Sequence, residues 1–121
     1  MAQYVDGFVI PMKKKNRNAY KKMAELGRKV WMEHGALAYY ECLGEDFSKW
    51  GLTFPKMCKL KKDETVIFAF IIYKSKAHRD RVNKRVHADP RMKMEGIAMP
   101  FDMERFATGG FEVIVRSKTS I

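Results

Sequence analysis

Apolar residues gather in short blocks along the chain, and the most apolar block is TVIFAFIIY at Thr65–Tyr73. From Val66 onward this block holds only Val, Ile, Phe, Ala and a final Tyr. The run is too short to cross a bilayer, and its β-branched and aromatic residues favour a β-strand. A strand with one face in water alternates apolar and polar residues, which this run does not do. We therefore expect both faces of this strand to be covered.

The first third of the chain predicts a strand, a helix and a second strand. Tyr4–Met12 is apolar and β-branched, and it is predicted to be a strand that stops at Pro11. Lys14–His34 predicts a helix because its apolar residues recur at steps of three and four, and the following Gly35 is typical of a helix end. Ala36–Gly44 then predicts the second strand.

The remainder of the chain predicts a long connection, two helices and a last strand. The connection holds several aromatic residues, so we expect it to fold over an edge of its own domain or over a partner subunit. Ser75 and Asp89 are suited to cap helices, and a proline follows Asp89 at the first helical position. The predicted ranges are Glu45–Glu64 for the connection, with Lys56–Leu60 as a candidate short strand, Ser75–Ala88 and Asp89–Gly96 for the helices, and Arg105–Arg116 for the last strand.

This order of elements, βαββαβ, is that of the ferredoxin-like α+β fold. Right-handed crossovers place both helices on one face of a four-stranded antiparallel sheet, with the first and third strands in its centre. The 121 residues suit one core, so the prediction is a single domain over residues 1–121. Gly7 leaves room for a helix to approach the first strand, which assigns its neighbour Asp6 to the opposite, helix-free face.

Positive charge is concentrated in the predicted helices. The chain holds 24 Lys and Arg against 14 Asp and Glu, a net charge of +10. Lys13–His34 carries +6 and Lys74–Arg91 carries +5, whereas the rest of the chain sums to −1. Basic helix faces are common and keep small proteins soluble, so this charge is weak evidence for nucleic-acid binding. Binding of RNA or DNA through the basic helical layer stays an alternative function.

Cysteine usage and the missing motifs narrow the class of protein. Cys42 and Cys58 form no CxxC motif, no membrane span is present, and Met1–Gln3 leads straight into strand-like sequence. We therefore expect a cytoplasmic protein without a signal peptide or a disulfide framework. The sequence contains no phosphate-binding loop, metal-ligand spacing or nucleophile motif. It predicts no metal and no cofactor, and it assigns no reaction.

Two hypotheses explain what covers the helix-free face of the sheet. Phe68–Tyr73 matches the last six positions of the octapeptide on the third strand of RNA-recognition motifs, but the basic residue and the glycine that begin that motif are absent. The sheet also contains Asp6, Glu41 and Glu112, whereas RNA on a sheet needs Lys and Arg beside the aromatic rings. We therefore favour closure by a second copy of the chain, which buries the apolar face in an intersubunit barrel. For the function, a purely structural interaction module stays a third hypothesis, beside small-molecule binding and nucleic-acid binding.

Four motifs carry a resemblance to a known family. They are YVDGFVIP near the start, ETVIFAFIIYKSKAHRDRVN in the middle, DPRM at Asp89–Met92, and FDMERFATGGFEV at Phe101–Val113. Over nearly the whole chain the sequence resembles the YbaA-like proteins, a bacterial family of unknown function in the dimeric α+β barrel superfamily. The resemblance implies a homodimer with joined sheets. It implies no particular catalytic residues.

Candidate catalytic residues are polar groups among apolar strand residues. Burial of Asp6 and Glu41 would raise the pKa of each carboxyl group toward the range of a general acid or base, and His34 lies nearby in the predicted fold. The structural interpretation is that the two carboxylates form ion pairs and that His34 stabilises a helix end. The side of the sheet on which Glu41 lies depends on a register that a slip of one residue would reverse.

We also predict a pocket on the helix-free face that holds a small apolar or amphipathic molecule. Its wall would include aromatic residues of the sheet, one aromatic residue of the long connection and an arginine. The predicted ligand-binding residues are Tyr40, Trp50, Phe68, Phe70 and Arg105.

Overall fold

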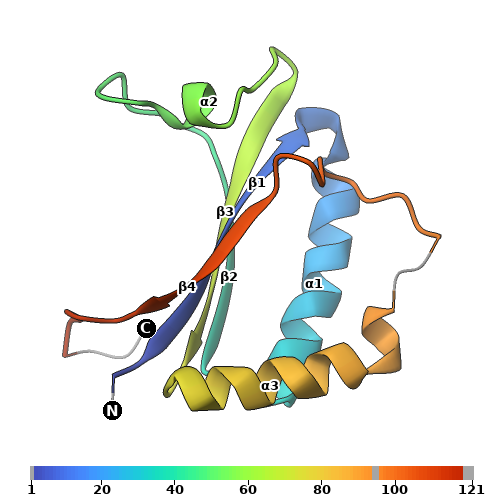
Figure 1. The fold of residues 1–121 in the computed structure, drawn as a ribbon. Coiled ribbons are helices and arrows are strands. Elements are labelled where there is room, and N and C mark those ends of the chain that lie inside the picture. Colours follow the sequence, from blue (N-terminus) through green and yellow to red (C-terminus); the bar gives the residue numbers. More distant parts are fainter. Residues whose placement is uncertain (1, 94–95, 119–121) are drawn as a thin grey trace.

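In a computed structural model, which describes residues 2–93 and 96–118, a four-stranded antiparallel sheet packs against two long helices (Figure 1). The strands are β1 (Tyr4–Lys13), β2 (Ala38–Leu43), β3 (Glu64–Tyr73) and β4 (Ala107–Glu112). The helices are α1 (Arg17–Glu33), α2 (Phe54–Met57) and α3 (Lys76–Ala88), with short 3-10 helices η1 (Lys14–Asn16) and η2 (Pro90–Met92). The strand order is β2-β3-β1-β4. The predicted ferredoxin-like order, with the first and third strands in the centre, is confirmed.

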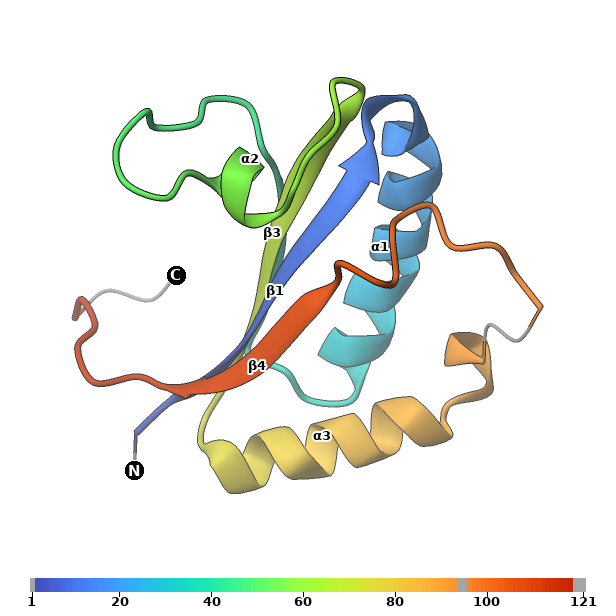
Figure 2. The same cartoon turned by 45° about the horizontal axis from the view of Figure 1, so that its top comes forward.

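The helices α1 and α3 lie on one face of the sheet, here named the covered face, while α2 lies on the other side (Figure 2). Two buried clusters fill the space beneath the helices, and their apolar burial holds the layers together. One cluster contains Ile10, Met12, Tyr20, Ala24, Ile67 and Ala69. The other contains Val30, Ala36, Ile71, Tyr73, Val82 and Val86.

The predicted helix caps are present. The Ser75 side chain accepts a hydrogen bond from the backbone N–H of His78 at 3.1 Å and begins α3. The Asp89 side chain accepts one from the backbone N–H of Arg91 at 2.9 Å and begins η2. This second helix is shorter than the predicted Asp89–Gly96, and residues 94 and 95 lie outside the described part of the chain.

Two glycines determine what approaches each face of the sheet. A Cβ atom at Gly27 would lie 2.6 Å from the Tyr39 hydroxyl, so this glycine lets α1 pass close to β2. A Cβ atom at Gly7 would lie 3.2 Å from the Phe111 ring, so Gly7 makes room for an aromatic ring and not for a helix. Because successive strand residues point to opposite faces, Asp6 lies on the covered face. The prediction that Asp6 lies on the helix-free face is wrong.

Strand β1 continues through Pro11 to Lys13, beyond its predicted stop. Pairing between β4 and β1 ends at Val9, and the Pro11 carbonyl on that side accepts a hydrogen bond from the Asp102 backbone at 3.1 Å. The nitrogen of Pro11 points the same way, toward a position with no paired strand. A central strand therefore tolerates this proline.

The face opposite α1, named the open face, is apolar. Two segments extend on this side in Figure 1: the arm, residues 45–63, which contains α2, and the tail, residues 113–118. The candidate strand at Lys56–Leu60 is wrong, because the Thr53 side chain and a following proline begin α2 there. The open-face residues of the paired strands are Val5, Gly7, Val9, Pro11, Ala38, Tyr40, Cys42, Val66, Phe68, Phe70, Ile72, Ala107, Gly109 and Phe111, with the charged pair Lys13 and Glu64 at the end of the sheet.

Candidate functional site

An apolar cavity of about 210 Å³ lies between the covered face and α1. Part of its wall comes from the segment 97–106, which runs past α1 on its way to β4 (Figure 1). Three methionines, Met23, Met92 and Met99, line it, and their flexible side chains adapt to different shapes. The other lining residues are mostly aromatic or aliphatic: Phe8, Ile10, Tyr20, Ala24, Gly27, Trp31, Tyr39, Tyr40, Glu41, Ala69, Ile71, Phe101 and Phe106.

Glu41 is the single charged residue among the described residues that line this cavity. Its Oε1 accepts a hydrogen bond from the Tyr20 hydroxyl of α1 at 2.7 Å, and its Oε2 accepts one from the Tyr39 hydroxyl at 2.7 Å. Tyr39 and Glu41 are two residues apart in β2, so both side chains point toward the covered face. We call this unit, Tyr20–Glu41–Tyr39, the tyrosine–glutamate bridge.

The two tyrosines of the bridge are neutral hydrogen-bond donors. Burial raises the pKa of Tyr20 and of Tyr39 far above the usual tyrosine value, and the nearby charge of Glu41 raises each further. Two acceptor positions of the Glu41 carboxylate are occupied, and its remaining lone pairs can accept a hydrogen bond from a bound molecule. The cavity therefore offers apolar walls and one oriented carboxylate.

Asp6 belongs to a buried polar network and does not line the cavity. Its Oδ2 accepts a hydrogen bond from Asn83 Nδ2 at 3.4 Å, and its Oδ1 lies 3.6 Å from Arg79 Nε. The Tyr73 hydroxyl and Trp31 Nε1 each donate to Asn83 Oδ1 at 3.3 Å. Asp6 thus joins β1 to α3.

His34 lies at the end of α1, also away from the cavity. Its Nε2 is 2.9 Å from Asp89 Oδ2. Arg91 Nη2 donates to Asp89 Oδ2 and to Glu33 Oε2, each at 2.7 Å. The bonds from Arg91, and then the contact with His34, hold the pKa of Asp89 well below its usual range. This cluster connects the end of α1 to η2.

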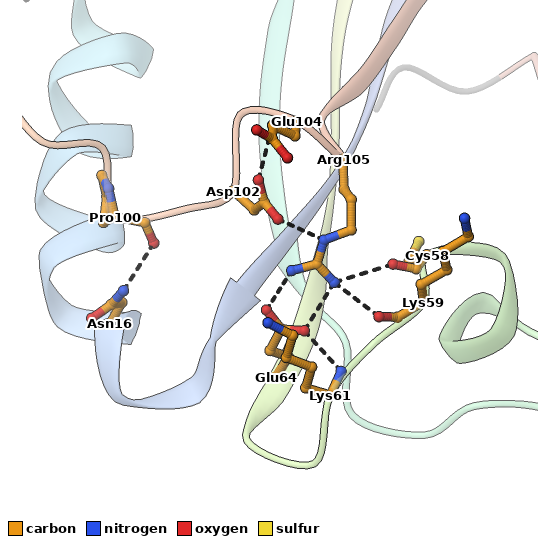
Figure 3. Close-up of polar contacts among 9 residues, drawn as sticks. All are labelled: Asn16, Cys58, Lys59, Lys61, Glu64, Pro100, Asp102, Glu104 and Arg105. Carbon is orange, nitrogen blue, oxygen red and sulfur yellow. Dashed lines mark hydrogen bonds and ion pairs between the residues drawn. The ribbon is translucent and has the colours of Figure 1, made fainter.

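Arg105 joins the arm, β3 and the segment before β4 (Figure 3). Its Nε donates to Asp102 Oδ2 at 2.6 Å, and its Nη1 donates to the backbone carbonyls of Cys58 and Lys59 at 3.3 and 3.0 Å. The guanidinium also binds both carboxylate oxygens of Glu64 and lowers the pKa of that group to about 2. All three nitrogens of Arg105 are engaged in these contacts, and it does not line the cavity.

The remaining predicted ligand residues lie on the open face or in the arm. The rings of Tyr40 and Phe70 stack with centroids 5.0 Å apart, and Phe68 lies beside Phe70 at 6.0 Å. Tyr40 also borders the cavity. Trp50 in the arm is 88% exposed. Of all predicted site residues, the structure brings only Glu41 and Tyr40 to the cavity.

Tyr39, Phe101 and Phe106 are among the cavity residues that were not predicted from the sequence. Tyr39 could have been predicted from the sequence, because Tyr39 and Glu41 occupy alternate positions of one strand and must share a face. Phe101 and Phe106 lie in an irregular segment, where no periodic pattern indicates which way a side chain points. Their rings are 5.7 Å apart, and Phe101 also meets Tyr20 at 6.0 Å.

Metal sites, membrane-spanning helices and reactive cysteines were also considered in the described part of the chain. No group of three or more His, Cys, Asp or Glu residues is arranged to hold a metal ion there. None of the helices described is both long and apolar enough to span a bilayer. Burial raises the pKa of the Cys58 thiol, which disfavours the reactive thiolate.

The sheet order and its helical layer define an α+β protein of the ferredoxin-like type. Residues 3–103 match the family described as "Protein of unknown function (DUF1428)", and the chain belongs to this family. It is 40% identical over 114 residues to "Uncharacterized protein YbaA" of Escherichia coli (strain K12), covering 93% of this chain and 97% of that protein. The same figures hold for "Uncharacterized protein YbaA" of Shigella flexneri. The resemblance to the YbaA-like family is confirmed.

Proposed function

We propose that this protein binds a small, mostly apolar molecule in the cavity between α1 and the covered face. The observation that carries the proposal is the cavity itself, with apolar walls around one oriented carboxylate. Ligand sites typically combine apolar walls with a few placed polar groups. A hydroxyl or amide N–H of the ligand would donate to Glu41. This site lies on the other side of the sheet from the pocket predicted from the sequence.

The walls of the cavity support binding of an apolar ligand. About 210 Å³ is lined almost wholly by apolar side chains, which offer water few hydrogen-bond partners. A ligand that displaces this water buries apolar surface, which contributes roughly 25 cal/mol per Å².

The proposal is tested with the neutral probe 4-phenylbutanol and two matched variants of α1. Ala24 is buried and lines the cavity, whereas Ala19 is exposed on the same helix. We expect calorimetry to give a dissociation constant of about 1 mM or lower for the wild type. Ala24→Leu fills part of the cavity and should weaken binding at least tenfold (about 1.4 kcal/mol), whereas Ala19→Leu should not change it. Equal affinity of all three proteins, or no binding to any, would contradict the proposal.

The proposed assembly is a homodimer in which two open faces pack together. The support is a run of exposed aromatic residues on this face, with Tyr40, Phe68 and Phe111 exposed by 40%, 47% and 61%. Large exposed apolar patches are rare on monomers and mark contact surfaces. The arm and the tail extend on the same side and carry Trp50 and Ile114, which are 88% and 86% exposed. A symmetric dimer buries both copies of one self-complementary patch.

Nucleic-acid binding is the second candidate function, and the exposed basic residues of α3 favour it. They are Lys76, Arg81, Lys84 and Arg85. RNA on the sheet is disfavoured, because the open-face strand positions carry one cation, Lys13, which is paired opposite Glu64 at the end of the sheet. The other three acidic residues of the sheet, Asp6, Glu41 and Glu112, occupy covered-face positions. A generic oligonucleotide should bind at low salt and lose affinity steeply as salt rises. Absence of binding at low salt would remove this candidate.

A further inference from the structure

A second hollow, of about 470 Å³, lies beside the cavity, between α1 and the edge strand β2. Its floor includes Met12 and Ile67. One side is formed by Arg17, Lys21 and Arg28, which follow one another at helical spacing along a single face of α1. We name this hollow the basic groove.

The basic groove and the apolar cavity share part of their walls. Tyr20, Ala24, Tyr39 and Glu41 line both. The tyrosine–glutamate bridge, with its two hydrogen bonds of 2.7 Å, therefore stands at the junction of an apolar space and a charged one. A molecule that occupied both would be apolar at one end and polar at the other.

The three cations of the groove have no polar partner within the described part of the chain. Within residues 2–93 and 96–118, none of Arg17, Lys21 and Arg28 forms an ion pair or a side-chain hydrogen bond, and all three are exposed. The groove also contains two carboxylates, those of Glu25 and Glu41. The cations thus exceed the carboxylates, and an anion entering the groove would find partners that nothing else occupies.

We propose that the ligand is an amphipathic anion, with its apolar body in the cavity and a carboxylate, phosphate or sulfate head in the basic groove beside Arg17, Lys21 and Arg28. This inference rests on the proposed function of the cavity. The cations give the ligand a direction. An anionic head inside the cavity would face the Glu41 carboxylate in apolar surroundings with no cation among the described lining residues, whereas in the groove Arg17, Lys21 and Arg28 offset the carboxylates. The head therefore lies in the basic groove.

Three probes with the same apolar body separate this inference from the proposed function: 4-phenylbutyrate, 4-phenylbutanol and 4-phenylbutylamine. We expect the carboxylate to bind at least about fivefold more tightly than the alcohol at low salt, since each partly screened charge contact contributes modestly. The difference should shrink as salt screens the groove. The amine should bind least well, because it meets three cations.

The triple variant Arg17→Gln, Lys21→Gln, Arg28→Gln locates the effect. It should reduce carboxylate affinity to that of the alcohol and leave the alcohol unchanged. The control Lys15→Gln, Lys22→Gln, Lys29→Gln removes the same net charge from positions outside both hollows and should change carboxylate affinity by less than about twofold.

The results with the three probes and the two triple variants distinguish failure of the proposed function from failure of the anion inference. If none of the probes binds, the proposed function fails and this inference fails with it. If the alcohol binds as well as the carboxylate, or the amine binds best, the anion inference is overturned while the cavity remains a binding site. If both triple variants lose carboxylate affinity equally, overall charge and not the groove attracts the anion, and the inference is again overturned.

Discussion

The two faces of the sheet differ in where their polar groups lie. On the covered face, Asp6 and Glu41 lie among apolar side chains and receive hydrogen bonds from Asn83, Tyr20 and Tyr39. On the open face, the paired strand positions carry apolar, cysteine, glycine and aromatic residues, except for Lys13 and Glu64 at the end of the sheet. A buried carboxylate needs partners, and Glu64 finds its partner in Arg105, at that end of the sheet and away from the open-face aromatic rings. We therefore propose ligand binding at the covered face and assembly through the open face.

The largest expected effect is on folding through the covered face. Ile71 is 3% exposed beneath the helices, so Ile71→Ala should reduce the free energy of unfolding by about 2–5 kcal/mol. Phe68 lies on the open face and is 47% exposed, so Phe68→Ala should cost less than about 2 kcal/mol in dilute protein. Urea unfolding at one low protein concentration measures both. Equal losses would contradict the contrast between the faces.

The next effect concerns assembly. Phe68→Lys places a charge in the proposed dimer interface, and it should raise the dimer dissociation constant at least about 100-fold, because burying an unpaired charge costs several kcal/mol. Met32→Lys is the control, since Met32 is 41% exposed on α1, away from the open face. Sedimentation equilibrium checks both variants. A wild-type chain that is monomeric at micromolar concentration would refute the dimer.

A smaller, pH-dependent effect is expected at the Arg105 contacts. Bonding to Arg105 lowers the pKa of Glu64 from 4.5 to about 2, so this stabilisation is complete above pH 4.5 and disappears as the pH falls toward 2. Glu64→Gln should be less stable than the wild type at neutral pH, and the difference should close within that interval. Exposed Glu104 supplies the control Glu104→Gln. A stability difference independent of pH would contradict this assignment.

The smallest effect is expected at Asp6. Its contacts are long, at 3.4 Å to Asn83 and 3.6 Å to Arg79, so Asp6→Asn should cost about 1 kcal/mol of stability. Because Asp6 does not line the cavity, the affinity for 4-phenylbutanol should stay the same. Loss of binding in a folded variant would restore Asp6 as a candidate site residue.

The sequence predicted the order of elements well, because each element has a local signal. Tyr20, Ala24, Gly27 and Val30 follow the helical period and are buried in α1, and the cap at Ser75 needs no distant partner. The apolar run of β3 pointed to a central strand, which the strand order confirms.

The site was predicted less well, because face assignments depend on contacts between distant residues. Gly7 was assigned a helix neighbour when its neighbour is Phe111, more than a hundred positions along the chain. That one error moved Asp6 to the wrong face. The ion pairs of Arg105 with Glu64 and Asp102 could not be inferred either, since no pattern relates the arm to the segment before β4.

The most direct test of ligand binding at the covered face is an NMR titration of the wild-type protein with 4-phenylbutanol. We expect the shifted side-chain resonances to belong to the covered face, with Tyr20, Tyr39 and Phe106 among them, while those of Phe68 and Phe111 stay in place. Shifts confined to Phe68, Phe70 and Phe111 would show that the ligand lies on the open face, and they would contradict the division of roles between the two faces.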